Sequence, residues 1–295
     1  MSNKKNNRGG AIVRLVIWSV VLLILVAILV LGLIFKNGFI LDGVISFSFL
    51  PSYTYENASK YIAGNTSFLD EVKNLDIEWT SGELKIFVYD GDEVMLEESG
   101  AGDHDENKMR TYLSDGTLHV RYAKSGIRLF GNIPVKDLII YLPEKYALAL
   151  DRVNIKIVSA DMDTEGKMVC RELDVESVSG KINLDEIYAA NAEMETVSGN
   201  ITARGEITDI DVDSVSAKLN LILTSTPRSL EAESVSGNIE ITLPRSGNGF
   251  HAKLDSTSGD MSVDGEDVGR IYKHGNCAAS FNFDTVSGDV KIDLQ

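Results

Sequence analysis

Along residues 151–295, apolar and polar positions alternate in a unit that recurs about every 20 residues. Each unit reads apolar-x-apolar, a short polar step, then Val or Thr, Ser and Gly, and then another x-apolar-x-apolar segment. Alternation with a period of two is typical of a β-strand that is buried on one face. The unit therefore predicts two strand segments that meet at the Ser-Gly step.

The first complete copy, "DVESVSGKINL", shows why a bend is expected there. Leu173 and Val175 share one parity, whereas Val178, Ile182 and Leu184 share the other. A strand cannot move its apolar side chains to the opposite parity without a corner or a bulge. Glycine beside such a bend suits either a positive φ or a backbone neighbour that approaches too closely for a Cβ.

One such unit cannot bury its own apolar stripe, but a stack of units can. The sequence therefore predicts an all-β protein, a β-solenoid of roughly 20-residue repeats with columns of serine and glycine at the corner. The alternative is a sandwich or meander of antiparallel hairpins with Ser-Gly as the turn. The predicted glycine slot is filled by Gly82, Gly180, Gly199, Ala217, Gly237, Gly259 and Gly288. Alanine in this slot favours close approach over an obligatory positive φ.

The repeats define a β domain over residues 70–295, which is less regular over 70–150 and contains the SVSG copies over 151–295. The strand "DVKIDL" ends the sequence without a polar cap. Either the insertion at 260–285 folds over this strand, or the strand supports self-association and head-to-tail assembly.

A second pattern lies at the N-terminus, where residues 15–35 contain no charged side chain. About 20 apolar helical residues span a bilayer, so we expect a single transmembrane helix and not a buried soluble helix or a cleaved signal peptide. The basic tail, 1–14, is then cytoplasmic and the β domain lies outside the cell membrane. Residues 36–69 form a juxtamembrane linker or cap.

Charge bears on the kind of partner, and cysteine content on whether a disulfide forms. The net charge is −16, and the four basic side chains of residues 1–35 leave −20 on the remainder. Such an acidic body repels phosphate backbones, so we expect no nucleic-acid partner. Cys170 and Cys277 are the only cysteines, and the sequence leaves open whether they pair.

No motif indicates catalysis. Gly180-Lys181 lacks the earlier glycine of a phosphate-binding loop, and the repeated serines lack the context of a nucleophile. Asp209, Asp211 and Asp213 alternate along one strand face, but a calcium loop would need glycine where Ser214 stands. We interpret this face as solvated, and expect no catalytic residue, no cofactor and no metal site.

The longest interval between repeats, residues 263–281, brings basic side chains into an otherwise acidic body. It carries Arg270, Tyr272, Lys273 and His274. Loops inserted between solenoid coils often bind partners. The segment is therefore either a binding loop or a cap over the end of the stack.

The strands "NLDIEWTSGELKI" and "FDTVSGDVKI" resemble a bacterial putative-adhesin family, a domain of unknown function with repeated TVSGDI-type strands behind one membrane helix. The resemblance covers about residues 70–295, and it implies a surface adhesin or an envelope sensing or scaffolding module. Its ligand would be a cell-surface or envelope protein or polysaccharide. The alternative of another class is a β-helix enzyme that acts on polysaccharides, which would need convergent acidic groups.

Overall fold

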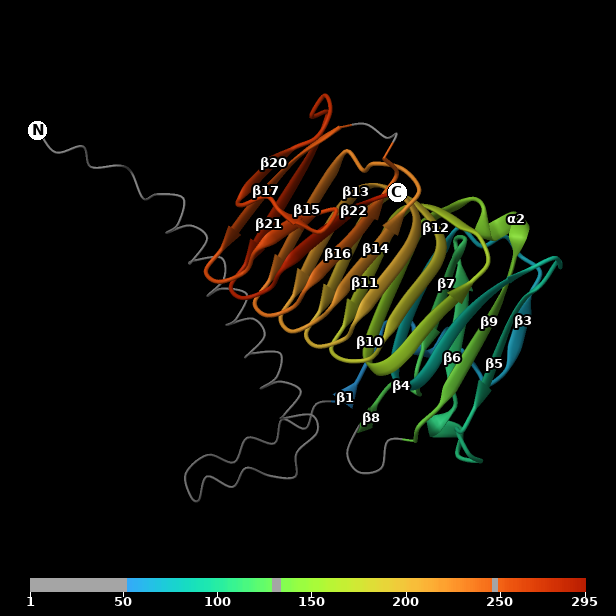
Figure 1. Cartoon of the computed structure of the whole chain (residues 1–295). Helices are drawn as coiled ribbons and strands as arrows, with labels where there is room; N and C mark the ends of the chain where they lie inside the picture. The colour runs from blue at the N-terminus through green and yellow to red at the C-terminus, as the bar shows by residue number, and fades with distance from the viewer. Residues whose placement is uncertain (1–51, 129–133, 246–248) are drawn as a thin grey trace, which may run out of the picture. The chain divides into compact units, whose positions relative to one another are not determined.

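The computed structural model describes residues 52–128, 134–245 and 249–295. The predicted membrane helix, 15–35, and the basic tail, 1–14, lie outside these residues. Within the described part, no helix combines the length and the apolar character needed to cross a membrane. β1 (Ser52–Tyr53) and β8 (Ile127–Arg128) form a separate two-stranded sheet, and all other strands belong to one repeated β body (Figure 1).

Most of this body consists of parallel strands that stack coil upon coil. The parallel strands are β4 (Asn74–Tyr89), β7 (Thr117–Arg121), β9 (Asp137–Pro143), β10 (Leu150–Glu165), β11 (Met168–Ser177), β12 (Ile182–Thr196), β13 (Ile201–Ser214), β14 (Leu219–Leu223), β15 (Ser229–Ser234), β16 (Ile239–Leu243), β17 (Phe250–Ser256), β18 (Met261–Val263), β21 (Ala279–Thr285) and β22 (Val290–Leu294).

Short antiparallel strands close the two ends of the stack. They are β2 (Ile62–Ala63), β3 (Thr66–Phe68), β5 (Val94–Ser99) and β6 (Arg110–Ser114) at one end, and β19 (Glu266–Asp267) and β20 (Ile271–Lys273) at the other. The described helices are single turns, namely 3-10 helices at Ala58–Lys60 and Asp105–Asn107 and α2 at Glu144–Ala147.

Strand pairing produces two walls that meet at the Ser-Gly corner. Wall 1 has the order β2-β6-β7-β4-β10-β11-β12-β13-β15-β21-β17-β20. Wall 2 has the order β3-β5-β9-β4-β10-β12-β13-β14-β16-β22-β18-β19. β12 and β13 pass through the opposite bend, near Glu186 and Gly205, and β4 and β10 pass through the Ser-Gly corner, so each of these four strands contributes to both walls.

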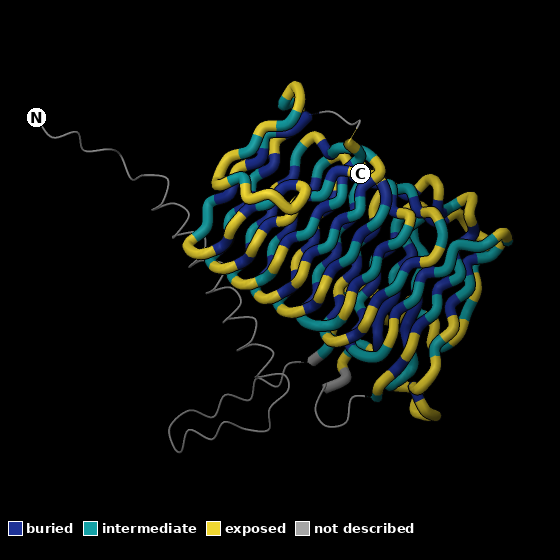
Figure 2. Tube along the Cα trace, in the orientation of Figure 1, coloured by how far each residue is buried: buried dark blue, intermediate teal, exposed yellow. Residues whose placement is uncertain are grey.

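The change of parity predicted from the sequence is present at this corner. Val175 and Ser177 are buried before it, and Ile182 and Leu184 are buried after it. Buried and exposed positions therefore alternate along each coil and line up between coils (Figure 2). Neighbouring coils pair in parallel, as in β11–β12 and β13–β15, which confirms repeated coils and excludes the antiparallel hairpins of the alternative.

The glycine slot forms a column along the corner. Its order in space is Gly82, Ala160, Gly180, Gly199, Ala217, Gly237, Gly288 and Gly259. A Cβ on Gly199 would overlap the carbonyl oxygen of Gly180, and one on Gly237 would overlap that of Ala217. Neither residue has a positive φ, so close approach is what selects glycine at these two positions.

Hydroxyl groups form a second column beside the glycines. Strand register aligns the buried side chains of Ser177, Thr196, Ser214, Ser234 and Thr285. The backbone N of Gly199 donates to Thr196 Oγ1 at 2.9 Å, and Ser214 Oγ donates to Ser234 Oγ at 3.0 Å. These hydroxyls satisfy polar groups that the bend would otherwise leave unpaired, since a buried unpaired group costs about 1–3 kcal/mol.

The last coil in sequence is not the last coil in space. β21 lies between β15 and β17, and β22 lies between β16 and β18. Val290 is in register with Ile239 on one side and Met261 on the other. Self-association through the C-terminal strand, one of the two sequence-based alternatives, is therefore wrong, because β22 is bonded on both edges.

We predict that Gly237→Ala destabilises the chain by about 1–3 kcal/mol, because the new Cβ forces the corners of two coils apart. Chemical unfolding followed by circular dichroism measures this change. Ala217→Gly is the control in the same column, and it should cost no more than about 1 kcal/mol. Equal losses for the two variants would contradict the close-approach explanation.

Candidate functional site

Carboxylates on wall 1 form the most regular chemical feature of the surface. β11, β12, β13 and β15 share two acidic positions, two residues apart, whose side chains point away from the buried core residues between them. We call these residues the acidic face. Its members are Asp174, Glu176, Glu193, Glu195, Asp211, Asp213, Glu231 and Glu233.

Parallel register arranges the acidic face into two rows. One row contains Asp174, Glu193, Asp211 and Glu231, and the other contains Glu176, Glu195, Asp213 and Glu233. Adjacent strands lie about 4.8 Å apart, so each carboxylate has like-charged neighbours above and below it. Asp284 on β21 and Asp255 on β17 continue the second row.

Positive charge compensates one end of these rows but not their centre. On β7, Arg121 lies 2.5 Å from Asp76 and 3.5 Å from Glu78. On β10, Lys156 binds Glu176 at 2.6 Å. No salt bridge joins the other members of the acidic face to a cation of the described residues.

Burial and, after it, crowding raise the pKa of several carboxyl groups of this face. Burial, followed by repulsion from Asp213 and Asp284, raises the pKa of Glu233 to about 7. Burial is also the first cause of the raised pKa of Asp213 and Glu195, and repulsion from neighbouring carboxylates is the second. The face thus holds negative charge that a cationic partner would stabilise.

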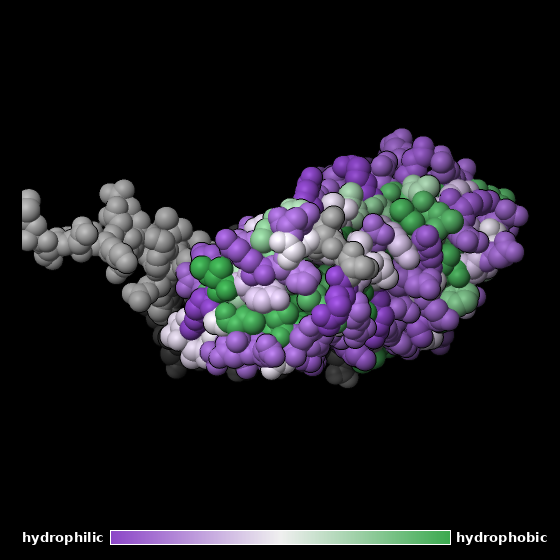
Figure 3. Space-filling view, turned by 45° about the horizontal axis from the view of Figure 1, so that its top comes forward, coloured by the Kyte–Doolittle hydropathy of each residue, from purple (hydrophilic) through white to green (hydrophobic). Residues whose placement is uncertain are grey.

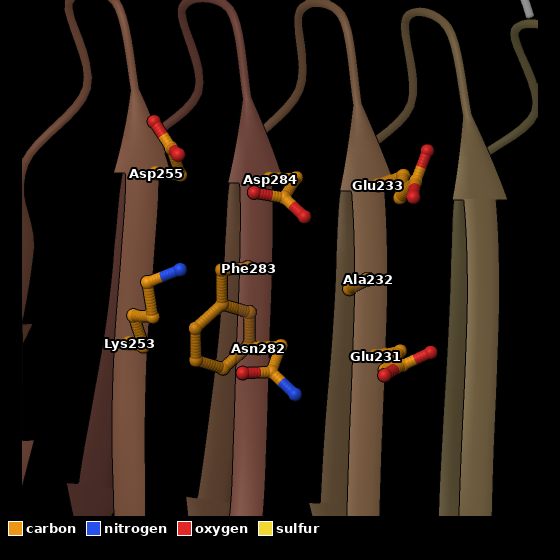
Figure 4. Close-up of a pocket in the computed structure, with 8 residues that line it drawn as sticks. All are labelled: Glu231, Ala232, Glu233, Lys253, Asp255, Asn282, Phe283 and Asp284. Atoms are coloured by element: carbon orange, nitrogen blue, oxygen red, sulfur yellow. The ribbon is translucent and has the colours of Figure 1, made fainter. Parts of the chain in front are cut away.

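The face contains two shallow hollows. One, of about 190 Å³, lies where Glu231, Glu233, Asp284, Asp255 and Lys253 meet on three adjacent strands (Figure 4). The other, of about 530 Å³, runs across the first row on β11, β12, β13 and β15. On the side of the molecule shown in Figure 3, hydrophilic residues form most of the surface, and hydrophobic residues form separate patches.

The aspartates singled out from the sequence are divided by the fold. Asp211 and Asp213 belong to the acidic face, whereas Asp209 pairs with Arg228 and accepts a hydrogen bond from Ser229 Oγ at 2.6 Å. Among the described residues, no group of three or more His, Cys, Asp or Glu side chains is arranged to hold a metal ion. The carboxylates are spread along a wall and do not converge on one point.

The structure brings the four residues of the predicted binding loop together at the end of wall 1. Arg270 and Lys273 are exposed, and the rings of Tyr272 and His274 lie 5.9 and 5.5 Å from that of buried Phe250. β20 also pairs with β17. The segment therefore caps the stack, one of the two alternatives, and whether it binds a ligand stays a prediction.

Lys136 is a buried cation that the sequence did not reveal. Its ammonium group lies 3.1 Å from Glu98, donates to the carbonyl oxygen of Asn107 at 2.6 Å, and lies over the rings of Trp79 and Tyr122. Burial lowers its pKa to about 8. Because these partners occupy its donors, we assign it to the packing of the N-terminal end.

The two cysteines are both free. Cys170 is buried in β11, and burial raises the pKa of its thiol to about 12, which keeps it in the unreactive protonated form. Cys277 is half-buried in the loop after β20.

Comparison with protein families finds a match that covers most of the β body. Residues 72–293 match the family model described as Toastrack DUF4097, which is a domain of unknown function. The predicted resemblance is thereby confirmed at the level of the family. No curated protein is significantly similar in sequence.

The chain is also similar to several solved structures. A putative adhesin from Bacteroides fragilis is 15% identical, with a TM-score of 0.50, and the match covers 79% of this chain and 97% of that one. A putative cell adhesion protein from Clostridium sporogenes is 14% identical, with a TM-score of 0.37 and coverage of 79% and 100%. A putative lipid binding protein from Parabacteroides distasonis is 12% identical, with a TM-score of 0.44 and coverage of 77% and 96%.

The raised pKa of Glu233 predicts a pH dependence of stability. Between an ordinary glutamate pKa of 4.5 and about 7, the folded chain holds a proton that the unfolded chain releases. The contribution of this group to the free energy of unfolding therefore falls as the pH rises through this window. Glu233→Gln should stabilise the chain at pH 8 by less than about 1 kcal/mol, because the carboxyl group is partly exposed.

Thermal unfolding between pH 5 and pH 8 checks this prediction, as the midpoint of the variant should depend less on pH than that of the parent. Glu240→Gln is the control, because Glu240 lies on wall 2 within 2.8 Å of Lys218. A parallel pH profile for Glu233→Gln and the parent would contradict the assignment.

Proposed function

The chain belongs to the Toastrack DUF4097 family, and from the geometry of wall 1 we propose that it is a non-catalytic binding protein of the cell surface. In this proposal the acidic face docks a cationic partner, such as a basic protein segment. The adhesin description of the Bacteroides fragilis neighbour agrees with a role in surface attachment. Sensing or scaffolding in the envelope would use the same contact.

The even spacing of these carboxylates, of which only Glu176 forms a salt bridge within the described residues, is the observation that carries this proposal. Catalysis by carboxyl groups needs two of them set about a common bond, about 5–10 Å apart across a cleft. The acidic face instead repeats a pair of carboxylates, Asp or Glu, on four neighbouring strands. Such a surface attracts a cation at long range and offers it many equivalent contacts.

The backbone beneath the face supports binding in a second way. The acidic side chains stand on strands that are bonded on both sides to neighbouring coils, and the residues between them are buried. A partner would therefore meet carboxylates whose backbone positions are already fixed, which limits the entropy lost on binding. This feature favours recognition by a rigid surface.

The proposed location follows from residues 15–35. Their apolar character and the basic tail before them support a single-pass anchor with residues 36–295 outside the membrane. In that arrangement the acidic face is available to partners in the envelope or on another surface.

We predict that neutralising the second row weakens binding of a decalysine probe by about tenfold or more at low salt, because three favourable charges are removed. The variant is Glu195→Gln/Asp213→Asn/Glu233→Gln, and calorimetric titration of the full chain in detergent measures the affinity. Added salt should weaken binding by the parent more than binding by the variant.

The matched control removes the same charge from wall 2 through Glu83→Gln/Glu97→Gln/Glu165→Gln. This variant should bind decalysine within about threefold of the parent, since its altered side chains lie away from the acidic face. Equal weakening by both variants would mean that net charge alone attracts the probe.

The membrane topology gives a separate prediction. Protease added to intact cells should degrade residues 36–295 and spare an epitope tag placed before residue 1, because the membrane shields only the cytoplasmic tail. Immunoblotting against the tag and against the acidic body distinguishes the two parts. Protection of the acidic body in intact cells would overturn the proposed orientation.

A further inference from the structure

The C-terminal end of the stack carries two strand edges of opposite charge. A hairpin with positive φ at Asp264 and Gly265 leads from β18 into β19, which adds to wall 2. The chain then crosses the end of the last coil and adds β20 to wall 1. One short segment therefore provides the final strand of both walls.

Both final strands have an outer edge that pairs with no strand of the described residues. The carbonyl oxygen of Arg270 accepts from the backbone N of Leu254 at 2.9 Å, and the backbone N of His274 donates to Phe250 at 2.8 Å. Because backbone groups alternate along an antiparallel strand, those of Ile271 and Lys273 point away from β17. By the same alternation, those of Asp267 point away from β18, since Val268 N donates to Met261.

The side chains at these edges are complementary. β20 is flanked by exposed Arg270 and ends with exposed Lys273, whereas β19 consists of exposed Glu266 and Asp267. Ile271 is 58% exposed, one of few large hydrophobic side chains that are open to solvent among the described residues. A basic edge with an apolar side chain thus lies beside an acidic edge on the same end of the molecule.

We propose that this end binds the same end of a second copy of the chain. A two-fold axis that passes between the walls through the Ser-Gly corner places β20 of each copy beside β19 of the other. The operation makes the two strands antiparallel, and it brings Arg270 of one copy to Glu266 of the other, on the same face of the wall. Both walls then continue across the dimer.

The opposite end of the stack is a poorer match for β19 and β20. Head-to-tail stacking that continues each wall would place β20 beside β2, which follows Lys60. It would also place β19 beside β3, which is followed by Asp70. Like charges would meet on both walls, and charged edges of this kind oppose strand addition. The two-fold contact between C-terminal ends is the arrangement that pairs opposite charges twice.

Sedimentation equilibrium of the full chain in a density-matched detergent tests the proposal. The parent should be a dimer at concentrations of about 10–100 µM, the range expected of a modest interface. Arg270→Glu and Glu266→Lys should each raise the dissociation constant by about tenfold or more, because each creates two like-charge contacts. A one-to-one mixture of these two variants should recover the affinity of the parent, since reversed edges complement one another.

Recovery in the mixture would also establish that both variants are folded. The control is Lys60→Glu, which makes the same change of charge at the other end of wall 1 and should leave the dimer unchanged. A monomeric parent at about 100 µM would overturn the proposal. So would a dimer that neither edge variant weakens, or a mixture that stays dissociated.

Discussion

The structure depends on the close approach of one Ser-Gly corner to the next. Parallel strands in neighbouring coils are held about 4.8 Å apart by backbone hydrogen bonds, and the corner must keep the same spacing as the chain changes direction. A Cβ at Gly199 or Gly237 would overlap a carbonyl oxygen of the adjacent coil. Small residues at this point therefore allow the backbone hydrogen bonds between coils to continue in both walls. The buried hydroxyls beside them form hydrogen bonds with polar groups at the bend.

Regular stacking has a consequence for charge. When coils repeat in register, a side chain of one coil lies against its equivalent in the next, so a sequence that repeats Asp or Glu builds a row of like charges. Burial is the first cause of the raised pKa values of Glu195, Asp213 and Glu233, and repulsion within the row adds to it. The same apolar stripe that holds the coils together thus fixes the spacing of the carboxylates. The same sequence repeat therefore supplies both the buried core positions and the carboxylates of the proposed binding surface.

The C-terminal end shows how the stack is closed. β21 and β22 insert beneath β17 and β18, so that the last residues of the chain lie inside the ladder instead of at its edge. The exposed strands at this end are the two short members of one cap segment, and both are charged. The strand edges open to another copy therefore belong to β19 and β20 and not to the regular strand β22, so a few side chains of these two short strands would determine assembly.

The sequence alone determined the repeat, the corner and the glycine slot, because each depends on local parity and on residue size at a fixed position. It did not reveal that Ala160 also occupies the slot, although Val158-Ser159-Ala160 repeats the residues around Ala217, and it marked only part of the acidic face. The sequence does show alternating carboxylates in each copy, but whether they form continuous rows depends on which strands are neighbours and in what register. The insertion of β22 and the buried ion pair of Lys136 with Glu98 were decided only by tertiary structure, because residues far apart in the chain must meet before these contacts exist.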